Sequence, residues 1–142
     1  MIYTPLTKKA LLLSFNAHKD QFDKSGMPYV YHPFHVAEQM KDELTVCVAL
    51  LHDVVEDSDV SPEDLRSYGF PDEVVGAVAL MTHSDDVPYF DYIKKIKRDP
   101  VASAVKLADL EHNMDLSRID LPKEKDLERI EKYKRAVEIL KE

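Results

Sequence analysis

Apolar residues recur along most of the chain at the three- and four-residue spacing that places them on one face of an α-helix. The C-terminal stretch is the clearest example, because lysines and glutamates fill the positions around its apolar stripe. That stripe consists of Leu127, Ile130, Tyr133, Val137 and Leu140. No alternating run of apolar and polar residues is long enough to indicate a strand. The pattern therefore predicts an all-α protein.

Proline marks the beginning of most of these stretches. It is favoured at the first helical position, where its missing N–H is not needed. Ser61 before Pro62 and Asp99 before Pro100 add a side chain that can cap the helix. With no linker or repeat between them, the elements form one bundle. The expected helices span residues 5–22, 33–40, 43–56, 62–67, 71–82, 88–97, 100–115 and 122–141.

The helix at 43–56 is expected to lie deepest, because it is apolar on nearly every side. It nevertheless ends on His52, Asp53, Glu56 and Asp57. Burying an unpaired carboxylate is costly or shifts its pKa strongly. The end of this helix must therefore emerge into solvent, meet a basic partner or hold a metal ion.

The spacing of these four residues favours a metal. Residues four apart lie on the same helix face, so Glu56 follows His52 and Asp57 follows Asp53 by one turn. This arrangement suits a divalent ion with a general base or a water-positioning group beside it. Without further motifs, a solvated helix end explains the four residues equally well.

Two residues elsewhere complete a ligand set. His32 lies at the start of a predicted helix, and Asp109 lies late in an otherwise apolar one, with Asn113 one turn further on. Two imidazoles and two carboxylates favour Mn²⁺, Fe²⁺ or Zn²⁺ over Ca²⁺, with Mg²⁺ as a further alternative. The plainer interpretations are a histidine packed in a turn for His32 and a helix cap for Asp109.

Composition limits the function classes. The chain has 142 residues, 44% of them apolar and 32% charged, as expected for one globular domain. Its net charge of −8 argues against non-specific binding to nucleic acid. The single cysteine, Cys47, excludes an internal disulfide. We find no secretory signal and no apolar run that could span a membrane, so we expect a cytoplasmic protein. The oligomeric state is left open.

The order of these motifs resembles that of the HD phosphohydrolase superfamily. His32, the pair His52 and Asp53, and Asp109 match its H…HD…D signature. Further segments are similar to the RelA/SpoT-type guanosine tetraphosphate hydrolase domains, and the resemblance runs from about residue 8 to about residue 118. These segments are 17–21, 24–29, 50–57, 89–93, 105–109 and 112–114.

The resemblance implies a single HD-type helical bundle over residues 1–142, without a synthetase or regulatory domain. It also implies one divalent metal ion, expected to be Mn²⁺, and removal of the 3′-pyrophosphate from guanosine 3′,5′-bis(diphosphate), abbreviated ppGpp. The implied metal ligands are His32, His52, Asp53 and Asp109. Glu56 and Asp57 would orient or deprotonate the attacking water, and Lys24 and Asn113 would contact the nucleotide.

Three acidic residues depart from the family pattern. Asp20 stands where many members have glycine, and Asp23 and Asp115 stand where many have arginine. Acidic groups near a tetraphosphate weaken its binding. The cations that could compensate are Arg118, Lys106 and Lys19. Two alternatives therefore stay open: a phosphohydrolase of a less anionic nucleotide or another phosphate ester, and a non-catalytic module that binds a nucleotide.

Overall fold

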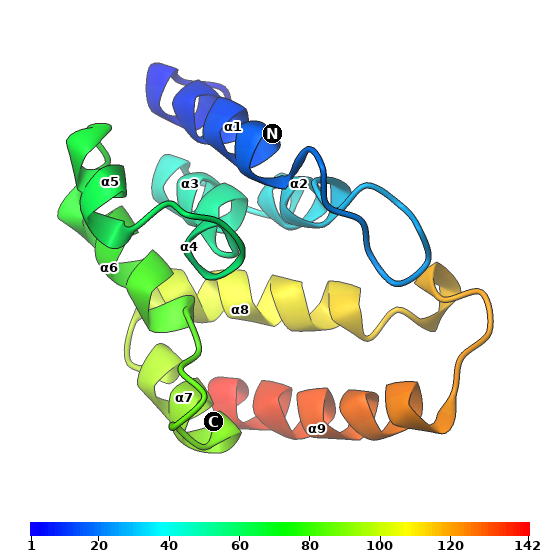
Figure 1. Ribbon diagram of the computed structural model, residues 1–142. Helices are drawn as coiled ribbons and strands as arrows, with labels where there is room; N and C mark the ends of the chain where they lie inside the picture. Colours follow the sequence, from blue (N-terminus) through cyan, green and yellow to red (C-terminus); the bar gives the residue numbers. More distant parts are fainter.

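The computed structural model describes residues 1–142 and is built from helices alone, which confirms the predicted all-α fold (Figure 1). None of the helices combines the length and the apolar character needed to cross a bilayer. In chain order the helices are α1 (Pro5–His18), α2 (Tyr31–Glu38), α3 (Glu43–Leu51), α4 (Val54–Asp57), α5 (Pro62–Ser67), α6 (Asp72–Met81), α7 (Tyr89–Lys97), α8 (Pro100–Asn113), the 3₁₀ helix η1 (Leu116–Arg118) and α9 (Glu124–Lys141).

Helix α3 is the centre of the bundle. It packs against α1, α2, α6 and α8, and every residue from Thr45 to Leu51 is buried. The expectation that this segment lies deepest is confirmed. Because its surroundings are filled by other helices, any polar group at its C-terminal end must find a partner inside the protein.

The prediction of one continuous helix over 43–56 is wrong. The chain turns at His52 and Asp53, so that α3 ends at Leu51 and the short helix α4 begins at Val54. The Nδ1 atom of His52 lies 2.6 Å from the carbonyl oxygen of Ala49. In a continuous helix that oxygen would accept from the backbone N–H of Asp53. The imidazole takes this place, and the helix ends there.

Helices α8 and α9 lie side by side and run in opposite directions, joined by the turn that holds η1 (Figure 1). The loop between α1 and α2 reaches the same end of the molecule, where the Ser25 hydroxyl donates a hydrogen bond of 2.8 Å to the carbonyl oxygen of Arg118. Gly26 has a φ of 82°, which favours glycine in this turn. Segments distant in sequence thus meet at one end of α8.

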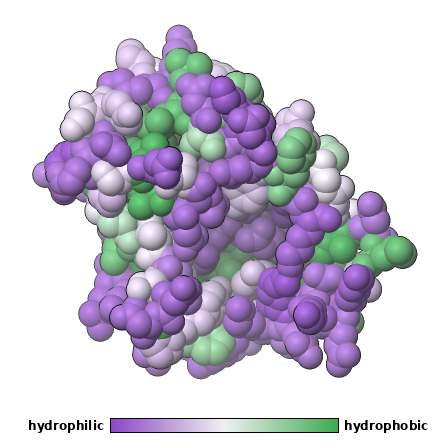
Figure 2. Space-filling view, viewed as in Figure 1, coloured by the Kyte–Doolittle hydropathy of each residue, from purple (hydrophilic) through white to green (hydrophobic).

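Hydrophilic residues cover most of the face in Figure 2.

Candidate metal centre and substrate cavity

Three buried side chains converge between α2, α3 and α8. His32, His52 and Asp109 each offer a ligand atom within 4.8 Å of the other two. The Oδ1 atom of Asp109 lies 2.8 Å from Nε2 of His32 and 3.5 Å from Nε2 of His52. Three donor atoms this close together, in a site shielded from water, can hold a single cation.

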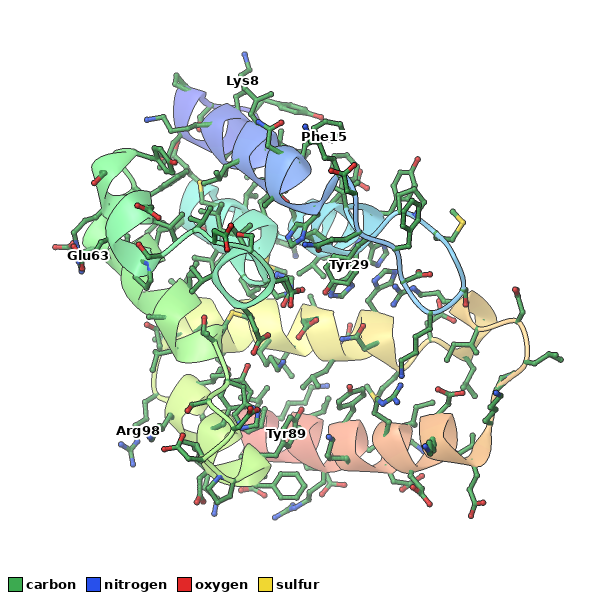
Figure 3. All side chains as sticks on the ribbon, viewed as in Figure 1. Lys8, Phe15, Tyr29, Glu63, Tyr89 and Arg98 are labelled. Atoms are coloured by element: carbon green, nitrogen blue, oxygen red, sulfur yellow. The ribbon has the colours of Figure 1, made fainter.

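Asp53 borders the same point. Its Oδ2 atom lies 3.0 Å from Nε2 of His52 and 3.9 Å from Nε2 of His32. The same oxygen accepts a 2.5 Å hydrogen bond from the hydroxyl of Tyr29, the residue labelled near α2 and α8 in Figure 3. Burial opposes ionisation of Asp53, but the neighbouring imidazoles outweigh it and lower the pKa of this carboxyl. The structure thus places all four residues of the expected ligand set around one centre.

The His52 ring is oriented by the end of α3. A carbonyl oxygen only accepts, so Nδ1 carries the proton in the contact with Ala49, and Nε2 faces the carboxylates. Nε2 is buried, and although Oδ2 of Asp53 lies 3.0 Å away, the two atoms are not aligned for a hydrogen bond. Burial lowers the pKa of His52, but Asp53 and Asp109 together raise it well above the usual value. A positive charge is therefore favoured here, and either a proton or a metal ion can supply it.

Lys106 holds the other oxygen of Asp109. Its ammonium donates a 2.7 Å hydrogen bond to Oδ2, so that Oδ1 is left facing the two histidines. Both side chains are largely buried, at 12% and 6% exposure. Burial raises the pKa of Asp109, but Lys106 and the histidines lower it well below the usual value. The carboxylate is therefore fixed both in charge and in orientation.

We expect Lys106→Met to destabilise the metal-free protein, because it leaves Asp109 without its cationic partner. Breaking such a buried pair costs about 3 kcal/mol or more. Urea unfolding with a chelator present would measure the loss, and added Mn²⁺ should recover part of it. Lys94→Met is the matched control, since Lys94 is exposed on α7. Equal unfolding free energies for Lys106→Met and the wild type would contradict the prediction.

Glu56 and Asp57 lie on α4, at the exposed end of the turn that carries Asp53. The Glu56 carboxylate accepts a 3.1 Å hydrogen bond from the backbone N–H of His83. The side-chain amide of Gln21 donates a 2.8 Å hydrogen bond to the carbonyl oxygen of Asp57. Desolvation and the nearby Asp53 carboxylate raise the pKa of both acids. A raised pKa makes a carboxylate a better proton acceptor.

A cavity of about 460 Å³ opens beside this centre, with His32 and Tyr29 in its wall. Lys24 and Asn113, which were expected to contact the nucleotide, both line it. The Asn113 amide also donates a 3.1 Å hydrogen bond to Oδ1 of Asp109. The cavity thus connects the candidate metal ligands to a space large enough for a small molecule.

The cations around the cavity differ in part from those expected. Arg118 lines it, whereas Lys106 is engaged with Asp109, and neither Lys106 nor Lys19 is among its lining residues. Arg129 and Tyr133 of α9 also line it and were missed by the sequence analysis. Nothing local marks these two residues, because the stripe of α9 reads as an ordinary amphipathic helix. Only the packing of α9 on α8 brings them to the cavity.

Two of the acidic residues that depart from the family pattern, Asp23 and Asp115, stabilise turns beside the cavity. Asp23 accepts hydrogen bonds of 2.9 and 3.0 Å from the backbone N–H groups of Ser25 and Met27. Asp115 accepts bonds of 3.0 and 2.6 Å from the backbone N–H and hydroxyl of Ser117. Both carboxylates therefore cap turns. Both also line the cavity, whereas Asp20 does not.

His112 stands behind His32, and their Nδ1 atoms are 2.7 Å apart. Burial, followed by the charge of Arg118, lowers the pKa of His112 to about 3. His112 lies in the segment 112–114, which is similar to the family, but nothing in the sequence indicates that it contacts His32. Its contact with a candidate ligand was not visible, because the two histidines are far apart along the chain.

Similar proteins carry synthetase and hydrolase names. A GTP pyrophosphokinase of Streptomyces coelicolor is 37% identical over 114 residues, covering 71% of this chain and 13% of that protein. The bifunctional (p)ppGpp synthase/hydrolase SpoT of Escherichia coli K12 is 32% identical over 122 residues, covering 75% of this chain and 17% of that protein. The chain therefore spans less than a fifth of these relatives. No family model matches it.

A solved structure shows the same fold over nearly the whole chain. It is that of a metazoan orthologue of SpoT, described as hydrolysing ppGpp. The match has a TM-score of 0.80 and 25% identity, and it covers 99% of this chain and 88% of that one. The relatives and this match confirm the resemblance drawn from the motifs. The chain therefore belongs to the HD superfamily, in the group of RelA/SpoT-type hydrolase domains.

Proposed function

We propose that this chain is a metal-dependent ppGpp hydrolase that removes the 3′-pyrophosphate, with Mn²⁺ as the expected ion. The observation that carries the proposal is the convergence of two imidazoles and two carboxylates beside a cavity lined by cations. The names of the similar proteins support the substrate class. His32, His52, Asp53 and Asp109 would hold the ion.

The donor set fits a divalent metal. The buried Nε2 of His52 has no hydrogen-bond partner and faces two carboxylates, as a ligand atom would. Carboxylate and imidazole donors together suit Mn²⁺, Fe²⁺ and Zn²⁺. A divalent ion here would supply positive charge that polarises a phosphoryl group and makes water more acidic.

The residues around the ion have separate tasks in this proposal. Glu56 and Asp57 orient or deprotonate the attacking water: one carboxylate takes its proton, and the raised pKa of each suits that role. Lys24, Arg118 and Arg129 bind the phosphate groups from the cavity wall. The amide of Asn113 contacts the nucleotide next to Asp109.

The charge balance of the cavity also fits a second substrate class, less anionic nucleotides or phosphate esters. Three cations, Lys24, Arg118 and Arg129, stand against two carboxylates, Asp23 and Asp115. This small excess of positive charge is also compatible with a nucleotide or phosphate ester that carries fewer charges than a tetraphosphate. A panel that includes ppGpp and simpler phosphate esters separates the two, because only the first yields pyrophosphate.

We expect the purified chain with Mn²⁺ to release pyrophosphate from ppGpp. Arg129→Ala should raise KM about tenfold with a smaller change in kcat, because it removes a binding contact that reactant and transition state share. Arg98→Ala is the matched control, since Arg98 is exposed next to α7. A chain that gains thermal stability from ppGpp but releases no product from any member of the panel would favour the non-catalytic module.

Three further expectations stay predictions. They are a single hydrolase domain over residues 1–142, a cytoplasmic location and the absence of membrane and nucleic-acid partners. The net charge of −8 supports the last of these, because nucleic-acid binding needs positive surface.

A further inference from the structure

His112 contacts the His32 ring at Nδ1, the nitrogen that points away from Asp109. The two Nδ1 atoms are 2.7 Å apart, and the planes of the two rings are parallel to within 2°. On its other side, Nε2 of His32 lies 2.8 Å from Oδ1 of Asp109. The His32 ring is therefore held at both nitrogens, and His112 supplies the outer contact.

The direction of this hydrogen bond depends on what His32 binds. If Nε2 of His32 binds a metal ion, the ring proton must be on Nδ1, and Nδ1 of His112 must accept it. Without an ion, Nε2–H of His32 can donate to Asp109, and His112 can donate to His32 instead. An imidazole serves in both directions, whereas a carbonyl oxygen only accepts.

His112 is itself held in place. It belongs to the last turn of α8, where the guanidinium of Arg118 donates a 2.8 Å hydrogen bond to its carbonyl oxygen. The exposed ring of His35 stacks on its outer face, with centroids 4.0 Å apart. The acceptor therefore does not need to be ordered when an ion arrives.

We propose that His112 is a positioning residue of the metal centre, which holds the His32 ring in the orientation and tautomer that leave Nε2 free for the ion. This inference rests on the metal site of the proposed function. Groups that orient a ligating histidine typically change metal affinity by 10- to 100-fold when they are removed, and we expect about that loss here.

The test is the affinity of the full chain for Mn²⁺ alone, measured by titration calorimetry. His112→Leu removes the nitrogen and should weaken binding by about 10- to 100-fold. His112→Asn keeps a polar group near the position of Nδ1 and should recover most of the affinity. His35→Leu is the matched control, because it removes the stacked ring but leaves the bond between His112 and His32 intact. Circular dichroism checks that each variant is folded.

The outcomes separate this inference from the proposed function. Equal Mn²⁺ affinity in the wild type and folded His112→Leu would overturn the role of His112 alone. A wild-type chain that binds no Mn²⁺ would overturn the metal site and this inference with it. If His112→Leu does not fold, His112→Phe keeps a flat ring without nitrogens and answers the same question.

Discussion

Asp53→Asn is expected to lower the rate of ppGpp hydrolysis with Mn²⁺ by at least about 10³-fold, since a catalytic metal contributes several kcal/mol to the transition state. The amide has nearly the size of the carboxylate, so the fold should persist. It removes, however, the negative charge that lies 3.0 Å from Nε2 of His52. Calorimetric titration with Mn²⁺ should show a parallel loss of affinity.

Asp91→Asn is the matched control for this variant. Asp91 is exposed on α7, and the same chemical change there should leave both Mn²⁺ affinity and the rate unchanged. If Asp53→Asn binds Mn²⁺ and hydrolyses ppGpp as the wild type does, Asp53 is not a ligand.

The second large effect is expected from the acids on α4. The double variant Glu56→Gln with Asp57→Asn should lower kcat by about 10²- to 10⁴-fold, the usual contribution of general acid–base catalysis. Its Mn²⁺ affinity should stay within a few-fold of the wild type, because both carboxylates belong to exposed residues outside the expected ligand set. Single-turnover assays with saturating Mn²⁺ would measure the effect, and the two single variants would show which acid accounts for it.

The control for the acid pair combines Glu38→Gln with Asp91→Asn. It removes the same charges from exposed positions on α2 and α7. Because long-range electrostatic effects on a polyanionic substrate would appear in both double variants, the difference between them isolates the contribution of α4. A wild-type kcat in the α4 double variant would exclude Glu56 and Asp57 from proton transfer.

The helices whose starts carry a cap were predicted closely. Helices α5 and α8 begin at Pro62 and Pro100, as the capping residues Ser61 and Asp99 indicated. Helix α1 was predicted to reach residue 22 but ends at His18. The Gln21 side chain turns back to hydrogen-bond the ring of His18 and the carbonyl oxygen of Ala17. The spacing of apolar residues does not predict helix ends that depend on such side-chain hydrogen bonds.

The candidate site could be predicted from its motif residues but not from their surroundings. The order of the motifs was enough to expect His32, His52, Asp53 and Asp109 around one centre. The contacts that orient them come from packing, such as the bond of Lys106 to Asp109 or of His112 to His32. Both partners lie in segments that the resemblance covers, but nothing in the sequence pairs Lys106 with Asp109 or His112 with His32, so only the folded chain identifies these contacts.

The break between α3 and α4 explains how two adjacent residues, His52 and Asp53, can both bind one ion. On a straight helical rod, adjacent side chains diverge by about 100°, and His52 and Asp53 would face different neighbours. The chain changes direction between them, and both reach the same point. A substitution near Ala49 that made α3 continue into α4 would turn the Asp53 carboxylate away from His52. The centre would then lack one negative charge, even though every ligand residue was still present.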